Sequence, residues 1–256
     1  MSYDWSSDNK LVLTCLSLRY LPDPVHGKPP ILDSTLLQER WDTVAGVLRL
    51  STKYEISVLR EKVATILSRY YPTTLADFDR LDKVASIRFC IAAVNLGRET
   101  NLLHILPAAF YFVALLGVEK IAKGMNEDRL SDAEFRVCII GRDKLCEATR
   151  TITYEPLCNR EHGSLNPSCT SDHQRCAQKA TNTALLTIYS TEPFFANPEA
   201  LMTLDDWQDI NWGDICTECM EYFQELNADG RPAVWRELPQ YFGLGSWEAL
   251  TKDAEA

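Results

Sequence analysis

The chain is poor in basic residues: its 256 residues include 26 lysines and arginines against 36 aspartates and glutamates, for a formal net charge of −10. Proteins that bind nucleic acid need clustered Lys and Arg, because contact with phosphates gains free energy by releasing counterions. An anionic membrane surface attracts the same residues. The charge balance therefore predicts that neither nucleic acid nor a membrane surface is a partner.

Long apolar runs are also missing. The most apolar stretch, residues 105–118, contains Pro107 and is shorter than the ~20 residues that a membrane-spanning helix needs. The first ten residues, MSYDWSSDNK, lack the basic start and apolar run of a secretory signal. We therefore expect a buried helix at 105–118 and an intracellular protein, in the cytoplasm or nucleus.

Catalytic motifs are lacking as well. The sequence has no G-x-S-x-G elbow and no Walker loop, and Gly243-Leu-Gly245 is only a fragment of a dinucleotide fingerprint. These absences favour a protein that is not an enzyme. The alternative is an enzyme of unrecognised type that uses Cys216 or the carboxylates between Asp205 and Asp209, although aspartates also suit the first turn of a helix.

Cysteine, in contrast, is abundant. The chain has nine cysteines, an odd number, and without a secretion signal this argues against a disulfide framework. In a reducing compartment, clustered cysteines indicate a metal site or simple packing. Four of them lie in apolar contexts and are expected to pack as small hydrophobic residues: Cys15, Cys90, Cys138 and Cys146.

The sharpest local motif is Cys216-Thr-Glu-Cys219, which precedes a helical pattern. Two thiolates at this spacing can bind one zinc ion, and a helix N-terminus favours them. A structural zinc site needs four ligands, so we predict that Cys169 and Cys176 supply the other two. The four sulfurs should then converge to within ~4 Å of each other, as Zn–S bonds near 2.3 Å require.

Other ligand sets remain open. Cys158, His162 and His173 lie in the same polar segment as Cys169 and are substitutes for the first pair. The cysteines can also be unrelated free thiols, because a lone CxxC is a weak signal. Redox chemistry by the CxxC has little support, since no βαβ pattern surrounds it. His104 borders the apolar run and is expected to be a hydrogen-bonded core or boundary histidine.

Apolar residues recur at steps of three and four from residue 33 onward, which predicts a mainly α fold built as a multi-helix array. We divide the chain into a poorly ordered segment 1–32, a helical region 33–155 and a small Cys-rich helical region 156–256 that packs on the preceding helices. Helices are predicted at residues 36–48, 56–70, 81–96, 102–116, 131–146 and 176–189, with short ones around Trp207 and over 216–226. A capping box, Ser131 with Glu134, should begin the fifth of them.

Four segments, in order, resemble a family of fungal BTB/POZ-domain proteins found in mushroom-forming species. They are residues 48–75 (LRLSTKYEISVLREKVATILSRYYPTTL), 105–117 (ILPAAFYFVALLG), 130–148 (LSDAEFRVCIIGRDKLCEA, with its Gly141-Arg142 step) and 216–250, which begins with the CxxC. The chain resembles the tail of a POZ fold with its helical extension. It lacks most of the family's strand-rich N-terminal half.

The resemblance implies a non-enzymatic protein–protein interaction role. It makes a cullin-type ubiquitin ligase scaffold a candidate partner, for which the chain would act as a substrate adaptor, and it implies no catalytic residue. The alternative from another class is a zinc-stabilised regulatory protein that contacts nucleic acid, which the net charge of −10 opposes. Under both hypotheses the predicted metal ligands are Cys169, Cys176, Cys216 and Cys219.

Overall fold

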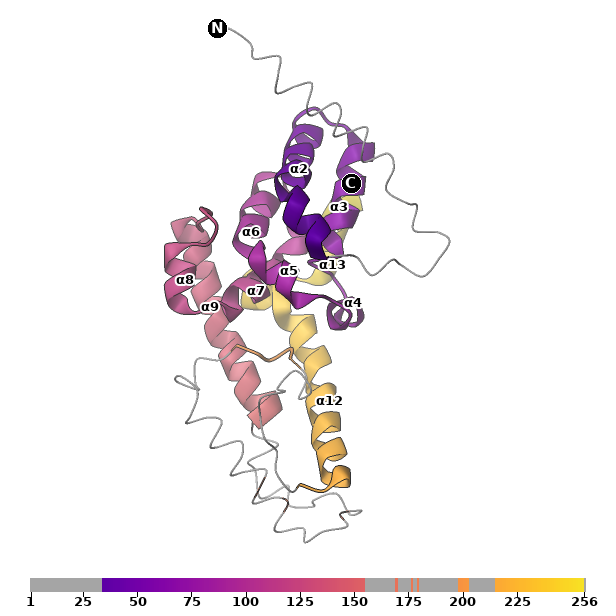
Figure 1. Ribbon diagram of the computed structural model, residues 1–256, viewed down its shortest axis with the longest axis vertical. Helices are drawn as coiled ribbons and strands as arrows, with labels where there is room; N and C mark the ends of the chain where they lie inside the picture. Colours follow the sequence, from indigo (N-terminus) through magenta and orange to yellow (C-terminus); the bar gives the residue numbers. More distant parts are fainter. Residues whose placement is uncertain are drawn as a thin grey trace, which may run out of the picture. The chain divides into compact units, whose positions relative to one another are not determined.

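The computed structural model describes residues 34–154, 169, 176, 179, 198–202 and 215–255 (Figure 1). Over these residues the chain is mainly helical, as the sequence predicts, and its β pairing is one isolated bridge between Met125 and Asp128. The contacts group the chain into two compact units, Met1–Ala109 and Phe110–Ala256, which we describe in turn. The expected divisions at residues 33 and 156 stay a prediction, and segment 1–32 lies outside the described residues.

Unit 1 starts with a pair of helices, α2 (Ser34–Lys53) and α3 (Ser57–Ser68). The turn between them requires a left-handed backbone at Glu55, whose φ is 53°. Ile56 was predicted as the first residue of an amphipathic helix over residues 56–70, but it precedes α3, and it is 42% exposed. Among the described side chains of the two helices, the fully buried apolar ones are Val47, Leu48, Val63 and Leu67, and the two helices contact each other.

The single helix expected over residues 81–96 is two helices, α5 (Lys83–Arg88) and α6 (Cys90–Glu99). The break is at Phe89, whose φ and ψ of −114° and 13° are not helical. Its ring stacks on that of Trp41, with centroids 5.0 Å apart. A stack of this kind is worth about 0.5–1.5 kcal/mol beyond the buried area, which helps to offset the interrupted helix. A short helix, α4 (Leu75–Asp79), precedes the pair.

Two buried hydroxyl groups join α5 to the chain after α3. Tyr71 Oη donates to the carbonyl of Ser86 at 3.0 Å, and Ser86 Oγ donates to the carbonyl of Tyr70 at 2.9 Å. Tyr71 and Ser86 are fully buried, and burial raises the pKa of the Tyr71 hydroxyl well above its usual range. Because buried polar groups are costly when unpaired, this exchange of hydrogen bonds fixes the position of α5 in unit 1.

The most apolar stretch forms a short 3₁₀ turn, η1 (Leu103–Ile105), followed by α7 (Leu106–Leu115). Pro107 lies in the first turn of α7, where its missing N–H costs nothing. The helix predicted over residues 102–116 therefore begins at Leu106, after a 3₁₀ turn. The helix crosses from unit 1 into unit 2, and its aromatic residues in unit 2 are fully buried: Phe110, Tyr111 and Phe112.

Unit 2 continues with α8 (Val118–Lys123), α9 (Asp132–Thr149) and a π-helical turn, η2 (Arg150–Tyr154). The serine half of the predicted capping box is present at the start of α9. Ser131 Oγ accepts from the backbone N–H of Glu134 at 3.2 Å. This bond satisfies one of the amides that a helix start leaves without a partner, and it confirms the predicted start of this helix.

The Gly141-Arg142 step of α9 makes two separate contacts in unit 2. A Cβ atom on Gly141 would lie 2.1 Å from Cδ1 of Phe242, so only glycine admits the Phe242 ring at this point. That ring stacks on Phe110, with centroids 5.1 Å apart. Arg142 Nη1 donates to the carbonyl of Ala114 at 2.8 Å, near the C-terminus of α7, where a cation also suits the helix dipole.

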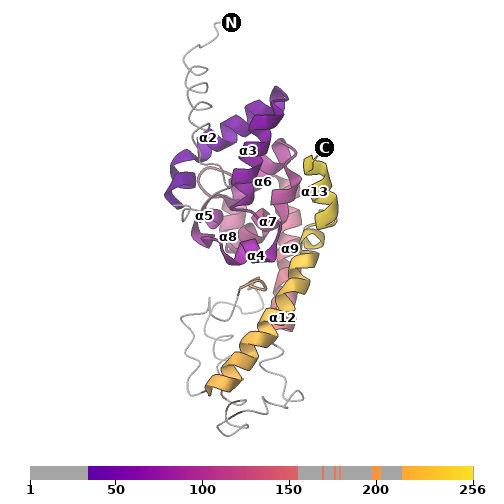
Figure 2. The same cartoon turned by 90° about the vertical axis from the view of Figure 1, so that its right-hand side faces the viewer.

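The C-terminal helices are α12 (Thr217–Tyr241) and α13 (Trp247–Glu255). The sequence predicted a short helix ending near residue 226, and this is wrong, because α12 continues through Pro232 and Pro239 (Figure 2). The side chains that α12 buries beyond residue 226 explain the continuation, since packing outweighs local propensity. They include Val234, Trp235 and Leu238. The helices predicted over residues 176–189 and around Trp207 lie largely outside the described residues.

Candidate metal centre

The first turn of α12 places two cysteines side by side. Cys216 is the N-cap residue, with an extended backbone at φ −68° and ψ 155°, and Cys219 is the third residue of the helix. The backbone N–H of Cys219 bonds the sulfur of Cys216, which places this sulfur at the helix N-terminus, where the backbone amides carry partial positive charge. The helical pattern that follows the CxxC in the sequence thus positions the pair as predicted.

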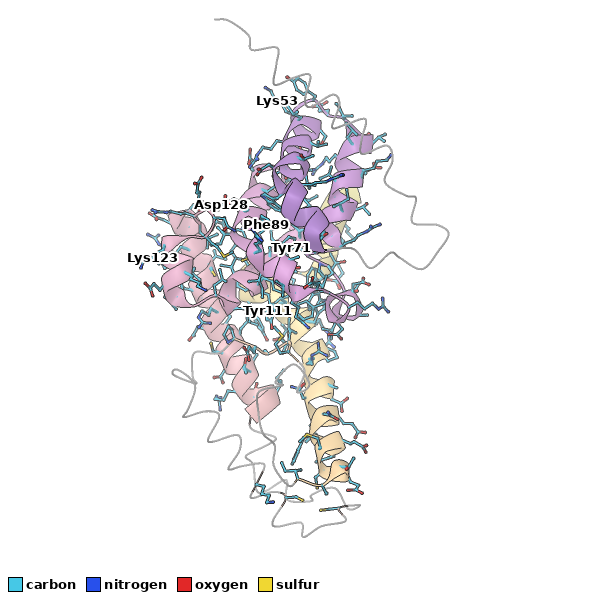
Figure 3. All side chains as sticks on the ribbon, viewed as in Figure 1. Lys53, Tyr71, Phe89, Tyr111, Lys123 and Asp128 are labelled. Carbon is cyan, nitrogen blue, oxygen red and sulfur yellow. The ribbon has the colours of Figure 1, made fainter. Side chains whose placement is uncertain are left out.

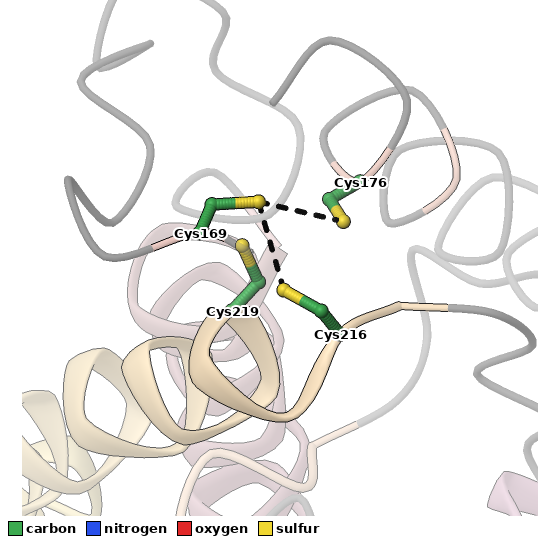
Figure 4. Close-up of side chains that lie close together, drawn as sticks. All are labelled: Cys169, Cys176, Cys216 and Cys219. Carbon is green, nitrogen blue, oxygen red and sulfur yellow. Dashed lines mark hydrogen bonds between the residues drawn. The ribbon is translucent and has the colours of Figure 1, made fainter. Parts of the chain in front are cut away.

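The sulfurs of Cys169 and Cys176 meet this pair (Figure 4). Cys169 Sγ lies 3.6 Å from Cys216 Sγ and 3.9 Å from Cys176 Sγ, and all four sulfurs lie within 4.8 Å of one another. A tetrahedral zinc site with bonds near 2.3 Å needs sulfurs ~3.8 Å apart. The convergence expected from the sequence is therefore present, although the widest separation exceeds the expected ~4 Å. Four cysteines arranged in this way can hold a metal ion.

Burial differs between the members of the cluster. Cys176 and Cys219 are buried, with 0% and 1% of their surface exposed, whereas Cys169 and Cys216 are partly exposed. The buried pair packs with Phe223, one turn further along α12. Partly buried apolar residues surround this group: Ile215, Tyr222 and Leu226. The cluster thus has an apolar inner side and an accessible outer side.

The two cysteines of α12 have different acidities. The backbone N–H of Cys219 favours the thiolate form of Cys216 and lowers the pKa of that thiol to about 7. Burial, followed by the neighbouring sulfurs of Cys169 and Cys216, raises the pKa of Cys219 above its ordinary range. Metal coordination deprotonates thiols outright, so a bound cation would remove the difference by holding all the sulfurs as thiolates.

The described cysteines outside the cluster are Cys90, Cys138 and Cys146. Cys90 and Cys138 are buried in the helical units, and burial raises the pKa of Cys138 to about 12. This agrees with the expectation that they pack as small hydrophobic residues. Cys146 is half-buried. The substitute ligands Cys158, His162 and His173, the carboxylates between Asp205 and Asp209, and Cys15 lie outside the described residues.

His104 lies in unit 1 and is only partly satisfied. Its Nε2 atom is 3.0 Å from Ser68 Oγ, and that hydroxyl donates to the carbonyl of Ala64 at 2.9 Å. The Ser68 hydroxyl thus contacts both Nε2 of His104 and the Ala64 carbonyl. Nδ1 is buried without a hydrogen-bond partner among the described residues. Burial, and secondarily the charge of Arg60, lowers the pKa of His104.

A groove in unit 2 was not foreseen from the sequence. It lies between α9, η2 and α12, and charged residues of both signs line it. Many of these charges are matched locally. Arg150 pairs with Glu147 and thereby lowers the pKa of that carboxyl, and Tyr241 Oη donates to Glu237 at 3.1 Å. Cys146 also contributes to the wall.

Comparisons of the chain with protein-family models, with curated proteins and with solved structures return no match. Within the described part of the chain, no helix combines the length and the apolar character needed to span a membrane. The arrangement of the four cysteines therefore stands on its geometry alone.

Proposed function

We propose that the chain is a non-enzymatic protein-interaction module that docks through the turn between α2 and α3, and whose C-terminal region is fixed by a structural zinc ion. The observation that carries the docking role is the exposure of three apolar side chains at this turn. Tyr54, Ile56 and Val58 are 63%, 42% and 62% exposed. Clustered exposed apolar residues typically mark sites of protein contact.

The turn is held in a defined conformation, which favours a docking role over local disorder. Ile56 N–H donates to the carbonyl of Ser51 at 2.8 Å, and Lys53 lies over the ring of Tyr54 at 5.3 Å. Arg60 Nη2, on the next turn, donates to the carbonyl of Asn101 at 3.2 Å. Figure 3 labels Lys53 at the end of α2 that bears this turn. A preformed apolar surface loses little conformational entropy on binding.

The same turn lies in the segment that resembles the BTB/POZ family, residues 48–75. That resemblance supports a protein as the partner and makes a cullin-type scaffold the first one to test, with the chain as substrate adaptor. The net charge of −10 supports a protein partner over nucleic acid. Duplex DNA binding that falls steeply with added salt would contradict this part of the proposal.

Zinc is the metal that the donor set favours. Four thiolates without an open position are typical of structural zinc sites, and soft sulfur ligands discriminate against magnesium and calcium. Bound there, zinc cross-links Cys169 and Cys176 to the N-terminus of α12. The polar segment that contains Cys169 has few apolar residues, and such a cross-link would stabilise it.

The docking proposal is tested by affinity capture of the full chain from cells, followed by binding measurements with each purified partner. The variant Tyr54→Ser/Val58→Ser removes the exposed apolar groups. Val84→Ser is the matched control, because Val84 is 75% exposed in the same unit but lies away from this turn in sequence. We expect a partner whose affinity falls at least tenfold for the double variant and is unchanged for the control.

Equal affinity of the wild-type chain and the double variant for every purified partner would overturn the docking role of the turn. Direct binding to a purified cullin scaffold, lost in the same variant, would support the adaptor role. A partner that depends on the turn but is not a cullin would keep the interaction module and remove the ligase assignment.

A further inference from the structure

We propose that Cys169 and Cys216 are an oxidisable pair: peroxide joins them in a disulfide, and the metal leaves the cluster. This inference rests on the metal centre that forms part of the proposed function. It adds a modification site and a condition under which the metal is released. Three features of the cluster support this pair.

The first feature is distance. Cys169 Sγ and Cys216 Sγ are 3.6 Å apart, closer than the 3.9 Å between Cys169 and Cys176 (Figure 4). A disulfide requires a sulfur–sulfur distance of about 2.05 Å. The two sulfurs therefore need to approach by about 1.5 Å.

The second feature is access. Cys169 and Cys216 are the two partly exposed members, while Cys176 and Cys219 are buried and pack with Phe223. Peroxide reaches thiolates from solvent, so oxidation follows exposure as well as thiolate character. The two partly exposed cysteines are also the pair whose sulfurs lie 3.6 Å apart, so they are suitably placed for each other.

The third feature is connectivity. Cys169 and Cys216 are 47 residues apart in the chain, and they come from the two segments that the metal would join. A disulfide between them keeps these segments linked after the metal has gone. A disulfide within Cys216-Thr-Glu-Cys219 would instead leave the two segments without a covalent link. Oxidation of the exposed pair therefore replaces the metal cross-link with a disulfide between the same two segments.

The chemistry balances with hydrogen peroxide as the oxidant. One exposed thiolate attacks a peroxide oxygen, which gives a sulfenic acid and hydroxide. The second thiolate then attacks the sulfenic sulfur, the S–S bond forms and a second hydroxide leaves. Two protons from solvent convert the hydroxides to water. Two sulfurs have lost one electron each, the peroxide has gained two, and the metal has lost two of its ligands.

The test uses the full chain loaded with zinc and exposed to hydrogen peroxide in the presence of a chromogenic zinc chelator. Remaining thiols are alkylated, and the disulfide is located by mass spectrometry. Cleavage after Arg175 separates Cys169 from Cys176, and cleavage after Glu218 separates Cys216 from Cys219, so every pairing in the cluster is distinguishable. We expect one zinc released per Cys169–Cys216 disulfide, and rebinding of zinc after reduction with dithiothreitol.

Two variants sharpen the test. Cys169→His keeps a residue that can bind zinc but removes one oxidisable sulfur, and we expect at least tenfold slower zinc release by peroxide. Cys146→Ser is the matched control, because Cys146 is a half-buried thiol outside the cluster, and its rate should equal that of the wild-type chain.

Pairing of Cys216 with Cys219, or of Cys169 with Cys176, as the first product would overturn the assignment, and so would zinc release without any disulfide. Failure of the metal centre itself has a different signature. A purified chain that contains no zinc would contradict the proposed metal centre. Treating that metal-free chain with peroxide would still decide whether Cys169 pairs with Cys216.

Discussion

Trp247 supplies the hydrogen bond that Pro239 removes from α12. In a regular helix the carbonyl of Trp235 accepts from the backbone N–H of residue 239, but proline has no N–H. The indole Nε1 of Trp247 donates to this carbonyl instead, at 2.7 Å. The two indole rings also stack, with centroids 5.3 Å apart. The proline inside the helix and the tryptophan of α13 are therefore coupled.

This coupling predicts a double-mutant cycle. Trp247→Phe keeps an aromatic ring but leaves the carbonyl of Trp235 without this donor, which should cost about 1–2 kcal/mol of unfolding free energy. In a Pro239→Ala background the alanine N–H can donate to that carbonyl, and we expect the cost of Trp247→Phe to fall. Urea denaturation of the four chains measures the difference. A cost that is identical in both backgrounds would show that the hydrogen bond is not what links the two positions.

The metal centre predicts about one zinc per chain in metal analysis of the purified protein. Cys216→Ser and Cys219→Ser should each lose the metal, and Cys146→Ser should retain it. The loss lowers the free energy of unfolding, by about 2.7 kcal/mol when free zinc is ~100 times its dissociation constant. Calorimetry with and without chelator measures this effect. A chain that is free of metal, stably folded and indifferent to chelator would remove the zinc assignment.

The close approach of Gly141 and Phe242 predicts a large effect from a small change. In Gly141→Ala the new methyl group would lie 2.1 Å from the Phe242 ring, so the ring must move and its stack with Phe110 is disturbed. We expect a loss of about 1–3 kcal/mol in unfolding free energy. Phe242→Leu should reduce the extra cost of Gly141→Ala, which chemical denaturation of the single and double variants will show. Additive effects would locate the strain elsewhere.

The sequence predicted some helix boundaries well and others poorly, for physical reasons. A residue with a local signal was located well, because the predicted Ser131 cap begins α9. Features that depend on tertiary contacts were missed. Phe89 interrupts a helical pattern because its ring stacks on Trp41, which is distant in sequence. The length of α12 was underestimated because two prolines argue against a helix, while the buried side chains beyond them are visible only in the fold.

The candidate site shows the same division. The CxxC at Cys216 is a local motif, and its place at the start of a helix follows from the pattern after it. The choice of Cys169 and Cys176 rested on counting ligands, and the structure brings their sulfurs to the pair. The exposed turn at Tyr54 and Val58 was not predicted, because a helical period does not reveal which apolar residues remain exposed at a helix end.

His104 predicts a pH-dependent stability. Burial lowers its pKa in the folded chain below the ordinary value of 6.5, so the unfolded chain binds the proton first as the pH falls. The contribution of neutral His104 to the free energy of unfolding is fully present above pH 6.5, and it is lost as the pH falls through the folded-state pKa. His104→Gln should lack this component. The difference in unfolding free energy between the two chains, measured across this range, should shrink on acidification, and a constant difference would contradict the prediction.

Truncation after Arg231 removes the last part of α12 and all of α13. It deletes side chains that are buried in the full chain, among them Val234, Leu238, Phe242 and Leu250. Their apolar partners would become exposed, and we expect aggregation, measured by light scattering and sedimentation. The matched Trp235→Phe/Trp247→Phe chain keeps the apolar bulk and should stay soluble. A truncated chain that is soluble and fully helical would show that this segment does not close the helical core.

The spacing of the four cysteines has a consequence for biosynthesis. Cys216 follows Cys169 by 47 residues, and all four come after the first unit ends at Ala109. Chains fold N-terminal units first as they are made, so the helices of that unit assemble on the ribosome before a complete set of thiolates exists. Binding of a metal by the four cysteines would therefore be a late step of maturation, after the first unit has folded.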